Sequence, residues 1–127
     1  MSIPVELSGL AEAMARYRFA YLLTASERGA PRVVAVNAVL EGGELLIHET
    51  GSRTRDNALQ RPDVALVWPP LSEADYSLIV DGRAAAAGEK GLRIVPARAV
   101  LHRPAPSSQA SSPGACGSDC VKVVPAR

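Results

Sequence analysis

The chain has 127 residues, of which 47% are hydrophobic and 21% charged, and its net charge is +1. These values predict one globular domain and exclude a disordered chain. The balanced charge argues against nucleic acid or an anionic membrane as a partner. No apolar run reaches the roughly 18 residues that a membrane helix needs, and the first residues lack a signal-peptide pattern, so we expect a cytoplasmic protein.

The first regular element is predicted to be a short amphipathic helix. Ser8 is a candidate N-cap, because serine accepts hydrogen bonds from the first N–H groups of a helix. Apolar residues then recur at helical spacing, at Leu10, Ala13, Met14 and Tyr17. This stripe predicts a helix that packs on another element.

Six β-strands are expected after this helix, because runs of strand-forming residues alternate with turn signals. Gly29 and the pair Gly42-Gly43 mark two hairpin turns, and the second makes the second and third strands antiparallel neighbours. Asp81-Gly82 and Pro96 indicate a bulge or an edge in the last two strands. The expected strands are residues 19–25, 31–40, 45–50, 64–68, 76–87 and 92–102.

This order of elements predicts a mainly β fold, a six-stranded antiparallel Greek-key barrel, with a two-sheet sandwich as the alternative. A short helix over residues 53–60 is expected between the third and fourth strands. The predicted domain covers residues 1–103, and residues 104–127 form a flexible tail rich in Ser, Pro and Gly. Cys116 and Cys120 in this tail are either exposed thiols or partners in a disulfide or a metal site across a dimer.

The segment Gly51-Ser52-Arg53-Thr54-Arg55-Asp56-Asn57 is the most informative part of the sequence. It lies between a strand end and a helix start, where backbone N–H groups lack partners and the helix dipole is positive. Its two arginines and two hydroxyls add donors for a phosphate monoester. In the alternative interpretation, Ser52 or Thr54 caps the helix and the arginines are solvated.

The chain resembles the flavin-binding split-barrel superfamily of pyridoxamine 5'-phosphate oxidase. The resemblance covers residues 10–103. Its most specific parts are Gly51-Ser52-Arg53 and the run from Asn57 to Val67, and it also includes Gly82-Arg83-Ala84. It implies a split barrel, a homodimer and an FMN site at the subunit interface.

The resemblance also implies which residues hold the cofactor. Ser52 and Arg53 occupy its phosphate-binding positions, with Thr54 where the oxidase has lysine, and Arg55 is expected to supply the second cation. Further cofactor contacts are expected along one strand, from the next strand and from the partner subunit: Arg32, Val33, Val34, Ala35, Val36, Asn37, Ile47, His48 and Ser77.

The function implied is that of a flavin-dependent oxidoreductase with an unknown small-molecule substrate. The Ser/Pro/Gly tail replaces the segment with which the oxidase grips its substrate, so pyridoxamine phosphate oxidation is not predicted. A deazaflavin-dependent reductase and a non-catalytic FMN- or haem-binding protein are the alternatives. His48 is the one candidate for a catalytic acid, because histidine exchanges protons near neutral pH; packing against the ring is its other interpretation. Trp68, before two prolines, is expected at the dimer interface.

Overall fold

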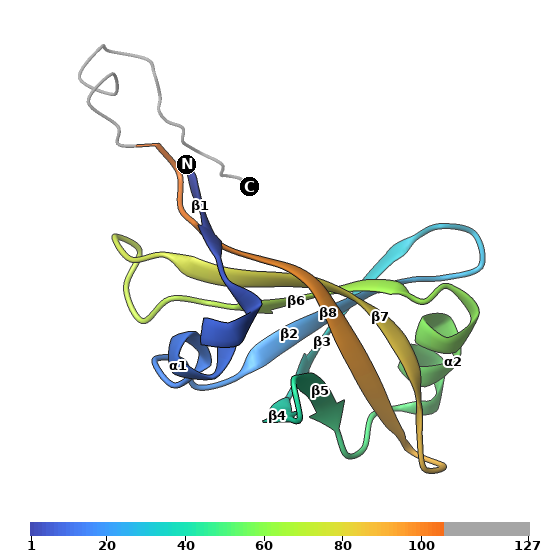
Figure 1. Ribbon diagram of the computed structural model, residues 1–127. Coiled ribbons are helices and arrows are strands. Elements are labelled where there is room, and N and C mark those ends of the chain that lie inside the picture. Colours follow the sequence, from blue (N-terminus) through green and yellow to red (C-terminus); the bar gives the residue numbers. More distant parts are fainter. Residues whose placement is uncertain (106–127) are drawn as a thin grey trace, which may run out of the picture.

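The computed structural model describes residues 1–105, which form a curled antiparallel sheet with short helices at its two ends (Figure 1). Residues 106–127, with Cys116 and Cys120, lie outside the described residues. The helices are η1 (Leu7–Gly9), α1 (Leu10–Met14) and α2 (Ser52–Gln60). The strands are β1 (Ser2–Val5), β2 (Ala20–Ala25), β3 (Pro31–Val36), β4 (Val39–Glu41), β5 (Glu44–Ile47), β6 (Asp63–Trp68), β7 (Ser77–Ala87) and β8 (Gly91–His102).

The strand order curls one open sheet into a split barrel. Its sequence is β3-β2-β6-β7-β8-β5-β4, so the two ends of the sheet, β3 and β4, are consecutive in the chain. Only Asn37 and Ala38 separate them, and this short link forces the sheet to curl until its ends approach. The predicted antiparallel barrel is therefore confirmed, and a single continuous sheet replaces the alternative two-sheet sandwich.

The predicted number of six strands was too small. The expected strand 31–40 is two strands: β3 pairs with β2, and β4 pairs with β5. Of these two strands, only β4 is the antiparallel neighbour of the third predicted strand, which is β5. The additional β1 was not predicted, because its four residues are mostly exposed and its partner is β8, a hundred positions away (Ser2 opposite His102). Long-range pairing of this kind leaves no local signal.

The first helix is shorter than predicted and is not capped by Ser8. Ser8 lies inside the 3-10 turn η1, and Gly9 is the N-cap of α1. After Met14 the chain tightens, because Arg16 and Tyr17 donate backbone hydrogen bonds three residues back. The helix α2 matches its predicted range within one residue.

The core is almost entirely aliphatic, as a chain with one Trp, three Tyr and one Phe requires. Alternate residues of the central strands point into it, so buried and partly exposed positions alternate along β2, β6 and β7. Trp68 is 3% exposed and belongs to this core, so its predicted place at the dimer interface was wrong. Buried positions alternate along β6, and Trp68 follows Val64 and Leu66 on the inward-facing side. The fully buried large side chains are Leu10, Leu22, Leu45, Ile47, Leu66, Leu78, Val80, Leu92 and Ile94.

The predicted irregularity in the last two strands is present. The pairing of β7 with β8 shifts between Asp81 and Gly82, where Gly82 faces Pro96. Pro96 also lies between the segments of β8 that pair with β5 and with β1. A proline is tolerated there, because a missing N–H costs nothing where a strand has no second neighbour.

Tyr17 ties the end of α1 to the loop between β6 and β7. Its hydroxyl donates a 2.8 Å hydrogen bond to the carbonyl of Tyr76. Burial raises the pKa of Tyr17 above its ordinary value of 10.0, Asp75 adds to this rise, and Arg16 opposes it. The neutral hydroxyl is therefore the form that the fold favours.

We expect Tyr17→Phe to lower the free energy of unfolding by about 1 kcal/mol at neutral pH, because one hydrogen bond is lost. The pKa of Tyr17 is higher in the folded than in the unfolded chain. Its contribution to the free energy of unfolding is therefore fully present below pH 10 and is lost as the pH rises through the folded pKa. The difference between wild type and Tyr17→Phe should thus be constant up to about pH 9 and shrink above pH 10. Urea unfolding at several pH values measures it, and Tyr76→Phe, whose exposed hydroxyl donates to the Met1 sulfur at 3.2 Å, is the comparison for losing a weaker hydrogen bond. A difference that grows at alkaline pH would contradict this account.

Candidate cofactor site

The helix α2 begins without a capping side chain. Its N-cap is Gly51, in extended conformation, and no side-chain cap bonds the first turn. The first backbone bond of the helix runs from Arg55 N–H to the Gly51 carbonyl at 3.0 Å. The N–H groups before Arg55 thus have no acceptor within the helix, and the positive end of its dipole is open. The alternative in which Ser52 or Thr54 caps this helix is not what the structure shows.

An open cavity of about 610 Å³ lies beside this helix. The turn between β2 and β3 forms its other wall, at the same end of the barrel as α2 (Figure 1). Polar and charged side chains line it: Ser26, Glu27, Arg28, Arg32, Ser52, Arg53, Asp56, Asn57, Gln60 and Arg61. Four arginines against two carboxylates make it a site for anions.

The arginines of this cavity differ in how they are engaged. Arg61 donates from Nε to the Ala25 carbonyl at 2.8 Å, and its Nη2 donates more weakly to Asn57 Oδ1 at 3.5 Å. It therefore fastens the end of α2 to β2. Within residues 1–105, Arg28, Arg32 and Arg53 make neither an ion pair nor a side-chain hydrogen bond. These three cations are available to a ligand.

Asn57 supplies a second sign that this cavity is built for a ligand. Its side chain lines the cavity and is 7% exposed, and its Nδ2 group has no hydrogen-bond partner within the described chain. A buried amide without a partner costs about 1–3 kcal/mol. A bound acceptor would remove that cost.

A second cavity, of about 470 Å³, lies at the other end of β3. Its lining is largely apolar, with one histidine and one carboxylate: Phe19, Ala35, Val36, Asn37, Val39, His48 and Glu49. Among the described strands β3 pairs with β2 alone, so the N–H and C=O groups of its outer edge are unpaired. Arg32, at one cavity, and Asn37, at the other, are roughly 17 Å apart along the strand. The two cavities thus offer a cationic, anion-binding end and a largely apolar end.

Comparison with known proteins supports this interpretation of the fold. No model of a known protein family matches the chain. Two uncharacterized proteins, of Mycobacterium bovis and Mycobacterium tuberculosis, are each 39% identical to it over 132 residues, which cover 92% of this chain and 93% of theirs. The chain belongs to the family of these two proteins. Their names give no function.

Solved structures identify the fold of that family. An FAD-binding protein of Mesorhizobium loti superimposes with a TM-score of 0.64 at 13% identity, over 80% of this chain and 95% of the other. A Clostridium acetobutylicum protein of the pyridoxinephosphate oxidase family gives 0.62 at 12% identity, over 78% and 91%. An F420 reductase gives 0.54 at 18% identity, over 68% and 90%. These structures share the fold of this chain, so the split barrel that the resemblance implied is confirmed as its fold.

Most of the residues predicted from the split-barrel resemblance border the two cavities. Arg32, Ser52 and Arg53 line the first. Four more predicted residues line the second cavity, namely Ala35, Val36, Asn37 and His48. Val33 and Val34 lie on β3 between the cavities.

Besides Val33 and Val34, four predicted residues line neither cavity of the single chain. Ile47 and Thr54 are buried, at 1% and 8% exposure. Ser77 begins β7, opposite His102. Arg55, expected to be the second phosphate cation, donates instead to backbone carbonyls of the turn between β7 and β8. The sequence could not show this, because the turn lies more than thirty positions further along the chain.

Sequence reasoning missed ten residues that line the two cavities, among them Arg28, Glu49, Asn57 and Arg61. Asn57 and Arg61 follow Arg53 at four and eight positions, so helical spacing could have placed all three on one face of α2. Arg28 lies in the β2–β3 turn, where its proximity to Arg32 follows from the hairpin. Glu49 had no local signal.

Proposed function

We propose that this protein is a homodimeric oxidoreductase that binds FMN between the arginine cavity and the outer edge of β3. The observation that carries the proposal is the cluster of unengaged cations at the uncapped start of α2. A helix N-terminus with added arginines is a strong site for a phosphate monoester. Arg53, Ser52 and the first N–H groups of α2 hold the phosphate, and Arg32 supplies the second cation in place of Arg55.

The donor set fits a phosphorylated flavin at both ends. The phosphate end offers guanidinium, hydroxyl and backbone donors, and the orphaned Asn57 amide lies at its wall. The ring end offers the free edge of β3 and the apolar walls of Phe19 and Val39. A flat heterocycle with a polar rim stacks on such walls and takes hydrogen bonds from such an edge.

When bound, a flavin supplies hydride transfer. The chain orients the ring through the backbone of Ala35 to Asn37, and the amide of Asn37 donates to its polar rim. Donors at that rim favour a ring that carries negative charge. His48, exposed in the second cavity, is the candidate there for a catalytic acid.

An apolar face on the outside of the barrel supports the homodimer. The strand registers place Val33, Leu23 and Ala65 in one row across β3, β2 and β6, and Tyr21 with Val67 in the next. Val33 is 57% exposed and Tyr21 37%. Contiguous apolar patches of this kind mark interaction surfaces. A second copy is the occupant we propose, because the face borders the open second cavity, and a partner subunit seated on it would wall off the ring end.

The small molecule that accompanies the purified protein tests the proposal. We expect a flavin absorption spectrum and, after denaturation, release of FMN identified by mass spectrometry. A haem Soret band would favour the haem-binding alternative. A colourless protein that binds added F420, a deazaflavin, but not FMN would favour the reductase named by one structural neighbour. Failure to bind any flavin or deazaflavin after incubation would overturn the proposal.

A further inference from the structure

Arg55 fastens the first turn of α2 to the turn between β7 and β8. Its Nε donates to the Gly91 carbonyl at 3.1 Å, and its Nη2 donates to the Gly88 carbonyl at 2.7 Å. The side chain is partly buried and lines neither cavity. The two carbonyls match the forked donors of a guanidinium. The single ammonium of a lysine would not bond both carbonyls in the same way.

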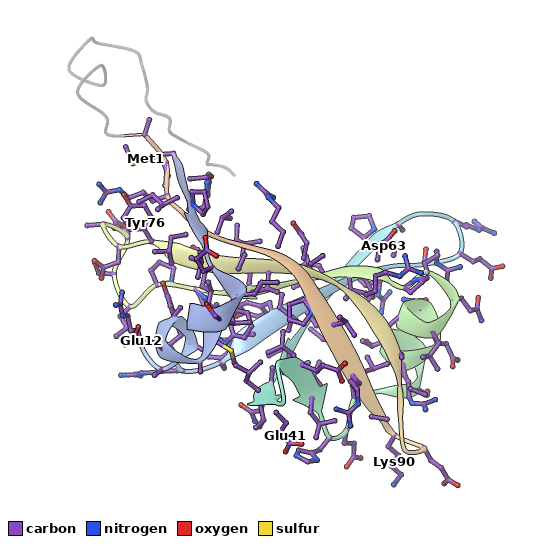
Figure 2. All side chains as sticks on the ribbon, viewed as in Figure 1. Met1, Glu12, Glu41, Asp63, Tyr76 and Lys90 are labelled. Atoms are coloured by element: carbon purple, nitrogen blue, oxygen red, sulfur yellow. The ribbon has the colours of Figure 1, made fainter. Side chains whose placement is uncertain are left out.

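The same turn also holds the end of β5. The backbone N–H of Thr50 donates to the Lys90 carbonyl at 3.0 Å. Gly91 packs so closely that an added Cβ would lie 2.6 Å from the Ile47 carbonyl oxygen and 2.7 Å from that of His48. Lys90 marks this turn in Figure 2, at the tip of the long β7–β8 hairpin.

The two halves of the proposed site are therefore attached to one common support. His48, at the end of β5, borders the ring cavity, and Ser52 and Arg53, at the start of α2, border the phosphate cavity. Only residues 49–51 join these segments along the chain. A three-residue link does not by itself hold two segments at a set separation, whereas hydrogen bonds from both to one turn do.

From these contacts we propose that Arg55 is a positioning residue, which sets the separation between the phosphate end and the ring end of the cofactor site. This inference rests on the proposed function. It differs from a role in phosphate binding, because the guanidinium is directed at backbone carbonyls of a neighbouring hairpin. It also accounts for an arginine at this place in the helix when the cavity already has other cations.

The charge-conserving variant Arg55→Lys separates positioning from phosphate binding. We expect Arg55→Ala and Arg55→Lys to weaken FMN, which spans both ends of the site, by the same factor, about three- to thirtyfold, and to weaken riboflavin, which lacks the phosphate, less. Arg53 is the matched control on the same helix turn, where Arg53→Lys, which keeps the cation, should retain more FMN affinity than Arg53→Ala. Fluorescence titration measures both dissociation constants, and Arg55→Lys keeps the charge should Arg55→Ala fail to fold.

Recovery of FMN affinity in Arg55→Lys relative to Arg55→Ala would make Arg55 a phosphate ligand and overturn the inference. Unchanged affinity for both ligands would overturn it as well. Hydrogen exchange gives a readout that needs no ligand: the Thr50 amide should exchange faster in both Arg55 variants and at the wild-type rate in Arg53→Ala. If wild type binds neither flavin, the proposed function fails, and faster Thr50 exchange would still show that Arg55 couples the two segments. Unchanged Thr50 exchange would show that it does not.

Discussion

Arg53→Ala is expected to weaken FMN binding at least about tenfold while leaving riboflavin binding nearly unchanged. Arg53 lies at the uncapped start of α2 and makes no ion pair among residues 1–105. Its guanidinium is thus free for a phosphate, and a charge-assisted hydrogen bond is worth about 1.5–3 kcal/mol. Adding Arg32→Ala should weaken FMN binding by about a further tenfold, because this second cation lines the same cavity.

Two controls make this result specific to the phosphate. Arg83→Ala removes an arginine that is 65% exposed and pairs with Asp63 outside the arginine cavity, so FMN affinity should be unaffected. Riboflavin should bind wild type and Arg53→Ala alike, which shows that the ring end is intact. Equal losses for FMN and riboflavin would mean that Arg53 acts on the fold rather than on the phosphate. Unchanged FMN affinity in a folded Arg32→Ala/Arg53→Ala variant would place the phosphate elsewhere.

Val33→Asp is expected to convert the dimer into monomers. Val33 lies on the edge strand β3, at one end of the apolar row, and is 57% exposed in the single chain. In a twofold dimer each substitution occurs twice, and a carboxylate buried without a partner costs several kcal/mol. We expect the dimer dissociation constant to rise at least about a hundredfold, which corresponds to about 2.7 kcal/mol. Analytical ultracentrifugation over a concentration series measures it.

Ile3→Asp is the matched control for this substitution. Ile3 is 44% exposed on β1, which pairs only with the far end of β8 and takes no part in the proposed interface. It introduces the same charge on a strand of similar exposure and should leave the dimer intact. The Val33→Asp monomer should also bind FMN more weakly, because the ring cavity loses its outer wall. A wild-type chain that sediments as a monomer at all concentrations would contradict the homodimer.

The cofactor site was predictable to different degrees at its two ends. The phosphate end is local: Ser52 and Arg53 follow a glycine at the start of a helix, and both the helix and the residue types can be read from adjacent positions. Arg55 also lies near the start of this helix, but its hydrogen-bond partners, at positions 88 and 91, are in a distant hairpin that the neighbouring residues do not predict. The ring end depends on β3 lying at the edge of the sheet, which is a property of strand order.

The sequence by itself determined most of the barrel's strands, its tight turns at Gly29 and Gly42-Gly43, its aliphatic core and the helix that follows Gly51, because each arises from neighbouring residues or from alternation along one strand. Only the tertiary structure decided that the predicted long strand divides at Asn37, that β1 joins β8, that Trp68 faces inward, and that Arg55 donates to the turn between β7 and β8. These features depend on which distant segments meet. Such contacts depend on the energy of the whole packed sheet, and that energy cannot be worked out from one segment of the chain alone.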